Sequence, residues 1–181
     1  MKTYICILRG INVSGHNIVK MNELKTLAES LLFQNVQTYI QSGNIVFQSN
    51  NKFNNNLESE IKSKMLENFG LDIPVFVIAK DELELLILHN PFKNKNVDSM
   101  KLHVTFLLTE PNVELKNRIS EMTFGGDEFV IHGKAIYLYC PNGYGKTKLS
   151  NSFFETKLKV ITTTRNWKTV NQLLEIANSL S

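Results

Sequence analysis

Three polar segments carry the side chains that could do chemistry in this chain. They run from Arg9 to Gly15, from Tyr39 to Asn44 and from Thr163 to Trp167, and each lies where an apolar stretch begins or stops. Guanidinium, amide and hydroxyl groups in such places favour contact with a phosphate or carboxylate. With two lysines from a later loop, these segments predict the ligand-binding residues Arg9, Asn12, Gln41, Ser42, Asn44, Lys146, Lys148, Thr164, Arg165 and Asn166.

Two glycine-containing stretches approach phosphate-binding motifs without completing them. Residues 10 to 20 follow an apolar run and precede a helical pattern, so their backbone amides could face an anion. However, Asn12 stands where the dinucleotide-binding motif needs its second glycine, and an ordinary loop with turn glycines explains the stretch equally well. Gly145-Lys146-Thr147 matches the end of a Walker A loop, but Cys140 occupies the position of its first glycine. We therefore exclude a nucleoside triphosphatase, and we interpret the stretch as a flexible, basic loop.

The segment from Thr163 to Asn166 is expected to open the last helix. Its hydroxyls, its guanidinium and the unpaired amides of a helix start would then meet at the positive end of the helix dipole. A phosphate or carboxylate suits that position. The competing interpretation is that Thr164 or Asn166 caps the helix and that Arg165 is paired structurally.

Catalytic and metal motifs are incomplete. None of the four histidines has a partner at catalytic spacing, and neither Cys6 nor Cys140 has a second cysteine or histidine at metal-ligand spacing. Ser42 lacks the glycine two residues earlier that a nucleophile elbow requires. We predict no metal and no cofactor, and we assign no catalytic residue.

Composition places the chain among ordinary globular proteins. Of its 181 residues, 43% are hydrophobic and 20% are charged, and the net charge of +3 is too small to indicate nucleic acid by itself. The stretch from Pro141 to Lys168 is locally basic, because Glu155 is its only acidic residue. A solvated lysine face and a binding surface are both consistent with this pattern. The basic residues of the stretch are Lys146, Lys148, Lys157, Lys159, Arg165 and Lys168.

Apolar periodicity in the first half alternates between strand and helix. The predicted elements are a strand at Tyr4–Leu8, a helix at 21–32, a hairpin of 36–41 with 45–48, a helix at 57–69 and a strand at Ile73–Ala79. This β-α-β-β-α-β order is that of a ferredoxin-like unit. Both faces of the first strand are apolar, so we expect the second half of the chain to cover one of them.

The order of elements recurs about a hundred residues later. The expected elements are a short helix at 81–89, a linker at 93–99, a strand at 102–108, a helix at 113–122, a hairpin of 128–131 with 135–140, a helix around 153–158, a brief strand at 160–161 and a last helix from the Thr163–Asn166 segment. We predict an α+β protein with two tandem ferredoxin-like (βαββαβ-type) halves packed as one compact unit by duplication. The expected division is 1–80, a connecting helix and linker at 81–99, and 100–181.

No targeting or membrane segment is expected. The apolar run after Lys2 is too short for a signal peptide, and no stretch approaches the roughly 18 apolar residues of a membrane span. Two cysteines outside any disulfide framework favour reduced thiols. We therefore expect a cytoplasmic protein with no membrane partner.

Several motifs in combination resemble a known family. They are Leu8-Arg9-Gly10-Ile11-Asn12-Val13 with Gly15, Tyr39-Ile40-Gln41-Ser42-Gly43-Asn44, Gly145-Lys146 with Lys148-Leu149, and Thr164-Arg165-Asn166-Trp167. The chain resembles the domain of unknown function 1697 family over nearly its whole length. The resemblance implies a bacterial, single-chain α+β protein of ferredoxin-like units, and it implies no activity.

The leading functional hypothesis is a non-enzymatic binding module for an anionic ligand. Local basicity and two amide-rich segments predict a phosphate-bearing ligand, such as a nucleotide, or a nucleic acid as partner. One alternative is a small-molecule enzyme with a polar cleft between the halves, in which Arg9 or Arg165 holds an acidic substrate and His16 or Ser42 exchanges protons. Another is a protein-interaction scaffold whose polar motifs only fix turns and caps. The sequence does not distinguish oligomeric states.

Overall fold

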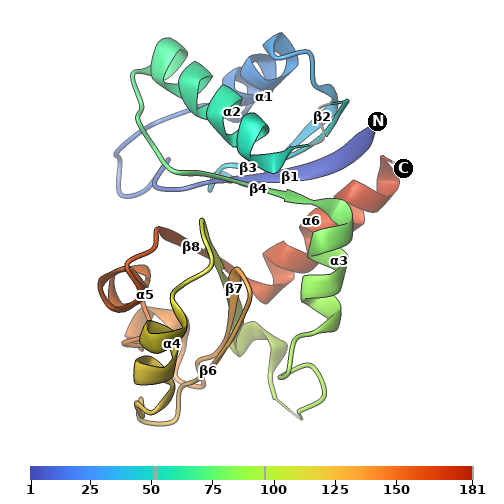
Figure 1. Cartoon of the computed structure of the whole chain (residues 1–181). Coiled ribbons are helices and arrows are strands. Elements are labelled where there is room, and N and C mark those ends of the chain that lie inside the picture. The colour runs from blue at the N-terminus through green and yellow to red at the C-terminus, as the bar shows by residue number, and fades with distance from the viewer. Residues whose placement is uncertain (51–52, 96, 181) are drawn as a thin grey trace. The chain divides into compact units, whose positions relative to one another are not determined.

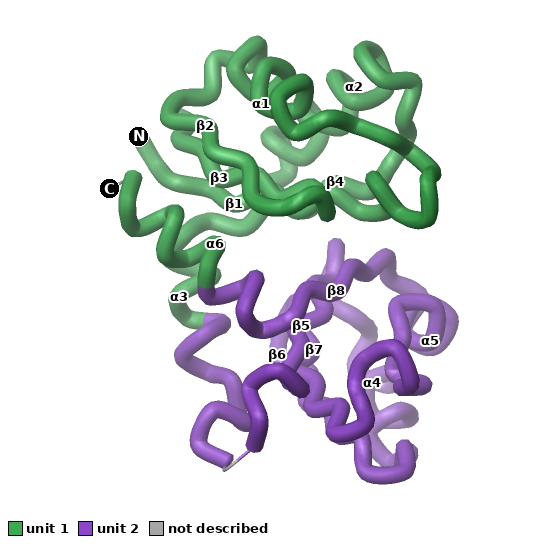
Figure 2. The backbone as a smooth tube through the Cα atoms, turned by 180° about the vertical axis from the view of Figure 1, so that it is seen from behind, with its two compact units in different colours: residues 1–85, 172–181 green, residues 86–171 purple. Residues whose placement is uncertain are grey.

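The chain folds into two antiparallel sheets with helices, an α+β architecture (Figure 1). The computed structural model describes residues 1–50, 53–95 and 97–180. Contacts divide the chain into two compact units, which are Met1–Leu85 with Gln172–Ser181 and Leu86–Asn171 (Figure 2). Asn96, inside the predicted linker, lies outside the described residues. Each unit is described by itself.

Unit 1 is built on a four-stranded sheet with the strand order β2-β3-β1-β4. Each neighbouring pair is antiparallel, and helices α1 and α2 lie on one face of the sheet (Figure 1). The elements are β1 (Lys2–Leu8), α1 (Met21–Ser30), β2 (Gln34–Tyr39), β3 (Asn44–Ser49), α2 (Asn54–Phe69) and β4 (Val75–Ala79).

The core of unit 1 forms from apolar residues that alternate along its strands and recur about every four positions along its helices. Tyr4, Cys6 and Leu8 alternate along β1 and enter one hydrophobic cluster with the buried sides of both helices. In α2 the buried residues Leu57, Ile61 and Met65 recur every four positions. Each large apolar side chain buried in this way contributes roughly 1.5–3 kcal/mol. The core holds β1 in place, and the first polar loop leaves from the end of that strand.

Unit 2 repeats the same strand arrangement, with the order β6-β7-β5-β8 and only antiparallel pairs. Helix α3 (Lys80–Leu88) runs into it from unit 1, and α6 (Trp167–Ser179) returns to unit 1. The other elements are η1 (Ser99–Lys101), β5 (Leu102–Leu107), α4 (Val113–Ser120), β6 (Glu128–His132), β7 (Ala135–Tyr139), η2 (Tyr144–Lys146), α5 (Asn151–Leu158) and β8 (Thr162–Asn166).

Aromatic packing closes the core of unit 2 on the helical face of its sheet. Phe124 meets Phe129 and Phe153 edge-on, and Phe154 makes the same kind of contact with Phe129 and Phe153. Edge-to-face pairs of this kind add about 0.5–1.5 kcal/mol beyond the area that they bury. They fix α5 against β6, so the loop between β7 and α5 starts and ends on rigid elements.

Most predicted elements are present, and the α+β class is confirmed. The end of unit 2 is where the sequence prediction is wrong. The last strand is Thr162–Asn166, not Val160–Ile161, and α6 begins only at Trp167. Three consecutive β-branched threonines prefer a pleated strand to a helix start. The segment that was expected to open the helix is therefore an edge strand.

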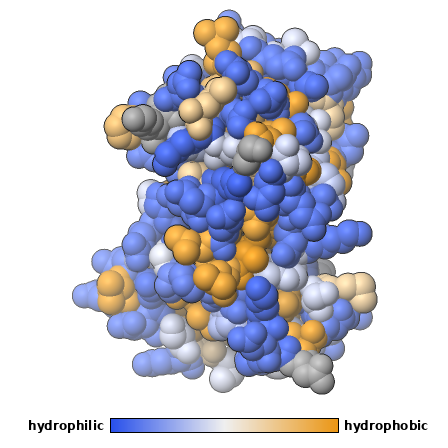
Figure 3. All heavy atoms as spheres, turned by 90° about the vertical axis from the view of Figure 1, so that its right-hand side faces the viewer, coloured by the Kyte–Doolittle hydropathy of each residue, from blue (hydrophilic) through white to orange (hydrophobic). Residues whose placement is uncertain are grey.

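The expected division at residues 80 and 99 stays a prediction about domains. The compact units have other boundaries, because most of α3 and the second part of α6 belong to unit 1. No helix among the described residues combines the length and the apolar character needed to cross a membrane. On the face shown in Figure 3, hydrophilic side chains predominate and hydrophobic ones lie in patches between them.

Gly43 offers a test of how tightly the β2–β3 turn packs. Its φ of +76° is left-handed, and an added Cβ would lie 2.5 Å from Cδ1 of the buried Ile11. We expect Gly43→Ala to lower the free energy of unfolding by about 1–2 kcal/mol for backbone strain and by about 1–3 kcal/mol more for overpacking. Urea unfolding of the purified protein measures the loss.

Gly10→Ala is the matched control for this substitution. Gly10 has a φ of +75° with nothing within 4 Å of its added Cβ, so only the strain of about 1–2 kcal/mol is expected. Equal losses at the two positions would show that Ile11 does not press on the turn.

Candidate functional site

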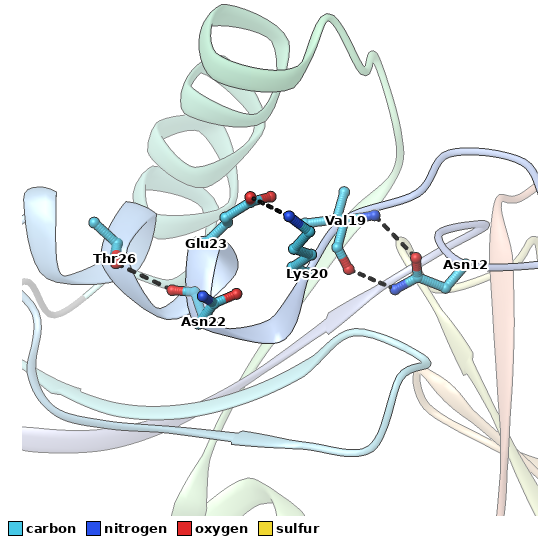
Figure 4. A network of polar contacts seen from close by, with 6 residues as sticks. All are labelled: Asn12, Val19, Lys20, Asn22, Glu23 and Thr26. Carbon is cyan, nitrogen blue, oxygen red and sulfur yellow. Dashed lines mark hydrogen bonds and ion pairs between the residues drawn. The ribbon is translucent and has the colours of Figure 1, made fainter.

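In unit 1, the Asn12 side chain ties the first polar loop to the β2–β3 turn. Its Nδ2 donates to the carbonyl oxygens of Val19 and Gln41, each at 2.9 Å, and its Oδ1 accepts from the Val19 amide at 2.9 Å. Figure 4 shows the two bonds to Val19 beside the start of α1, where Lys20 pairs with Glu23. Every hydrogen-bonding atom of this amide is therefore used inside the unit.

The turn side of the same junction is equally occupied. Asn44 is fully buried, and its Nδ2 donates to the Tyr39 carbonyl and to the Ser42 hydroxyl, each at 3.0 Å. The Gly43 carbonyl accepts from the Leu8 amide at 2.8 Å. The two motifs are therefore halves of one interlocked loop pair at the end of β1.

The loop from Gly10 to Asn17 carries an unusual backbone. Asn12, Ser14 and Asn17 have φ near +50° and are not glycines, and Asn17 Nδ2 donates to the Gly10 carbonyl at 2.8 Å. Left-handed backbone at non-glycine residues persists only where surrounding bonds impose it. The side chains of Ser14 and His16 are exposed on this loop.

The structure brings the five predicted residues of unit 1 to one end of its sheet. Arg9 follows β1 directly and is half-buried, while the Gln41 side chain is exposed in the neighbouring turn. Asn12, Ser42 and Asn44 make the internal bonds described above.

In unit 2, Thr164 belongs to a polar network under the helices. Its Oγ1 donates to Asn151 Oδ1 at 2.8 Å, accepts from the Tyr144 hydroxyl at 3.1 Å and lies 2.7 Å from Thr105 Oγ1. His103 stacks on the Tyr144 ring with 4.8 Å between centroids. Sequence reasoning missed the partners of Thr164, because they come from three elements between 13 and 59 residues away.

Burial shapes the titration of this network. It raises the pKa of Tyr144, with the hydrogen bond to Thr164 opposing the shift. It lowers the pKa of His103, whose Nδ1 is buried without a hydrogen-bond partner. A neutral imidazole stacked on a neutral phenol is the state that these shifts favour at neutral pH. The network stabilises the unit without carrying charge.

Thr147 occupies the hydroxyl position of the incomplete Walker loop, and it is used internally. Its Oγ1 donates to Asp127 Oδ2 and accepts from the Leu149 amide at 3.0 Å. Cys140 begins the same loop, and burial raises the pKa of its thiol to about 11. Thr147 therefore anchors the loop that exposes Lys146 and Lys148.

The β8 residues have structural partners too. Arg165 is 9% exposed, and its Nη1 donates to Thr163 Oγ1 at 3.1 Å and to the Thr164 carbonyl at 3.0 Å. Asn166 Oδ1 accepts from the Thr169 amide at 2.7 Å, which caps α6. The structure contains the Asn166 cap of the second interpretation, and the anion contact expected for this segment stays a prediction. Thr164 does not cap the helix.

Charge is divided unequally between the units. Unit 1 has eight Lys and Arg residues against ten Asp and Glu, a net charge of −2, whereas unit 2 has twelve against seven, a net charge of +5. Among the residues that the structure describes, seven lysines form ion pairs, and these seven precede residue 117. By contrast, five exposed lysines between residues 141 and 168 have no carboxylate of a described residue within 4.0 Å. They are Lys146, Lys148, Lys157, Lys159 and Lys168.

Two surface grooves of unit 1 lie apart from the predicted residues. One has a volume of about 410 Å³ between α1 and α2 and includes Glu23, Ser30 and Phe69. The other, of about 610 Å³, lies beside the start of α2 and includes Phe53 and Glu82. Within the described ranges, no cluster of three or more His, Cys, Asp or Glu side chains could hold a metal ion.

The whole sheet of unit 1 and the strands β5 and β6 of unit 2 fall within the match to a family model. The model describes a protein of unknown function, DUF1697, and it covers residues 1–137. The chain belongs to the DUF1697 family. Both polar motifs of unit 1 lie inside the matched residues, whereas the lysine-rich stretch of this family member follows them.

A solved structure shares the fold of this family member. It is described as the structure of conserved bacterial protein SP0830 from Streptococcus pneumoniae. The TM-score is 0.74 with 20% sequence identity, and the match covers 97% of this chain and 98% of that one. Among curated proteins, none matches the chain.

Asn12→Asp tests the clamp between the loop and the turn. The carboxylate keeps the acceptor for Val19 but loses both donors and faces two carbonyl oxygens. We expect a loss of about 2–3 kcal/mol in the free energy of unfolding, measured by urea denaturation. Asn17→Asp is the control, since it removes one exposed bond and should cost less than about 1 kcal/mol. Equal losses of unfolding free energy in the two variants would show that the Asn12 bonds to Gln41 and Val19 stabilise the unit no more than the exposed Asn17 bond does.

Cys140 makes stability depend on pH in the alkaline range. Burial raises its pKa to about 11 in the folded state from the ordinary 9.0 of a thiol, so folding favours the protonated thiol. This contribution is complete below pH 9 and is lost as the pH rises through 11. We expect Cys140→Ala to unfold with a shallower loss of stability between these pH values than the parent protein, as followed by urea denaturation at each pH. Parallel curves would contradict a thiol held protonated by the fold.

Proposed function

We propose that this protein is a non-enzymatic binding module for a phosphate-bearing polyanion, with nucleic acid as the ligand. The observation that carries the proposal is a set of five exposed lysines that have no carboxylate of a described residue within 4.0 Å, in a unit with a net charge of +5. Elsewhere in the described part of the chain, seven lysines pair with carboxylates. Lysines without an acidic neighbour leave their full charge available to phosphates.

The loop that carries Lys146 and Lys148 is held in place before any ligand arrives. The amides of Gly143 and Lys146 donate to the carbonyls of Cys140 and Gly143 at 2.9 and 3.0 Å. The Thr147 hydroxyl fixes the next turn through Asp127 and Leu149. A loop that is already ordered loses less conformational entropy on binding than a mobile one.

The distribution of the lysines favours a polymer over a single small anion. They lie on the loop after β7, on the last turn of α5 and just after it, and in the first turn of α6. The positive end of the α6 dipole adds to the potential near Lys168. Charges spread along three elements match a chain of phosphates, each of which releases counterions when a lysine replaces them.

A salt titration tests the proposal. Binding of fluorescent single-stranded RNA and DNA is measured by anisotropy at several salt concentrations, with nucleotides as competitors. We expect Lys146→Gln with Lys148→Gln to weaken binding at least about tenfold near 0.1 M salt and to reduce the slope of log K against log salt by about 2.

Lys25→Gln with Lys62→Gln is the charge-matched control. Both lysines are exposed in unit 1 and paired with Glu29 and Asp72. This variant should bind within about twofold of the parent protein, since it removes the same net charge from another surface. Absence of saturable binding to every probe at low salt, or equal losses in both variants, would refute the proposal.

We also propose that both units are ferredoxin-like and arose by duplication in a bacterial, cytoplasmic protein. The repeated order of strands supports the first two points, because β2-β3-β1-β4 and β6-β7-β5-β8 are the same arrangement. Similarity to a bacterial protein of the same fold supports the source. Two buried free cysteines support a reducing compartment.

A further inference from the structure

The two sheets present four outer strands, and three of these are protected against pairing with another strand. The outer strands are β2 and β4 in unit 1, and β6 and β8 in unit 2. An outer strand carries outward backbone groups that can template a further strand, and proteins usually block them with bulges, charges or covering segments. The exception is β6.

Carboxylates block β4 and β8. The Val77 amide donates to Glu58 Oε1 at 3.0 Å, and the Ala79 amide donates to Glu82 Oε2 at 2.9 Å. On β8 the Thr162 amide donates to Glu155 Oε1 at 2.9 Å, while Arg165 occupies the Thr164 carbonyl. Side chains thus take the place of a neighbouring strand along both edges.

A bulge blocks β2. Its register against β3 shifts between Gln34 and Gln37, and Asn35 has a left-handed φ of 52°. A bulge bends the strand and interrupts the row of outward groups. The strand is also polar on its exposed side, with the sequence QNVQTY.

Strand β6 has neither a bulge nor a bond to its outward amides. It pairs with β7 in unbroken register from Glu128 to His132. Because Gly133-Lys134 forms a two-residue hairpin, His132 and Val130 bond to β7, and Phe129 and Ile131 direct their backbone groups outward. No hydrogen bond from another described segment reaches those two amides.

We propose that β6 is the interface for a second copy of this chain, which adds its own β6 in antiparallel orientation about a two-fold axis at Val130. The strand sequence EFVIH is complementary to itself in this register. Glu128 then faces His132 of the other copy, Phe129 faces Ile131, and Val130 faces Val130. Phe129 of one copy and Ile131 of the other then form a hydrogen-bonded pair, in which each amide donates to the carbonyl of the facing residue.

Side-chain packing supports the same register. Phe129 and Ile131 are half-buried against the core of unit 2, so their pairing across the axis joins the two cores along one edge. Val130 is 41% exposed on the opposite face and is covered by its own counterpart. Pairs of aromatic with β-branched residues, as Phe129 with Ile131 would be, are favourable cross-strand combinations.

Sedimentation of the full chain over about 1–200 µM tests this interface. We expect a concentration-dependent dimer, and we expect Val130→Lys to raise its dissociation constant about tenfold or more, since two lysines then face each other at the axis. Gln37→Lys on the bulged β2 edge is the matched control and should leave dimerisation unchanged. Circular dichroism checks that each variant is folded.

Two further measurements separate the interface from effects on folding. Glu128→Lys and His132→Glu should each weaken self-association, and an equimolar mixture of the two variants should restore dimers because each lysine then faces a glutamate. Hydrogen exchange at Phe129 and Ile131 should slow as protein concentration rises. A parent protein that stays monomeric throughout the range, or a dimer that Val130→Lys leaves intact, would overturn the assignment. Neither result tests the proposed binding of a polyanion by the lysines.

Discussion

Every buried backbone amide must find a partner, and this requirement organises many of the polar residues of the protein. On the outer strands, Glu58, Glu82 and Glu155 accept bonds from strand amides that have no neighbouring strand. These glutamates look like ordinary surface acids, yet each one closes an edge. The charge of an accepting carboxylate makes such a bond stronger than a neutral one. Removing one of them would expose a strand as well as lose a bond.

The same requirement explains why the conspicuous polar motifs are occupied internally. Asn12 satisfies three backbone groups of two segments, Asn44 closes its own turn, and Asn166 caps a helix. An amide side chain both donates and accepts, so it can replace the backbone of a missing strand or helix turn. The exposed lysine ammonium groups are needed by no backbone atom, and the proposed polyanion binding uses these groups. In that proposal, amide side chains hold the architecture and lysines supply the affinity.

Periodicity carried most of the fold prediction, because apolar residues at two- and four-residue spacing report directly on strands and helices. It failed at Thr162–Asn166, where the residues are polar and only their β-branching indicates a strand. The position of the polar loops was predictable, since they border apolar runs. Their bonding was not, because Asn12 meets Gln41 across 29 residues and Thr164 meets Thr105 across 59. Contacts at such separations depend on topology, which local sequence does not encode.

Each unit contains one buried cysteine, Cys6 in the first and Cys140 in the second, and neither forms a disulfide. A reagent that modifies thiols can reach either sulfur only when the surrounding unit opens. The rate at which each thiol is modified therefore reports how often its own unit opens. Mass spectrometry of the modified peptides can rank the two units by kinetic resistance within a single sample, without any engineered probe.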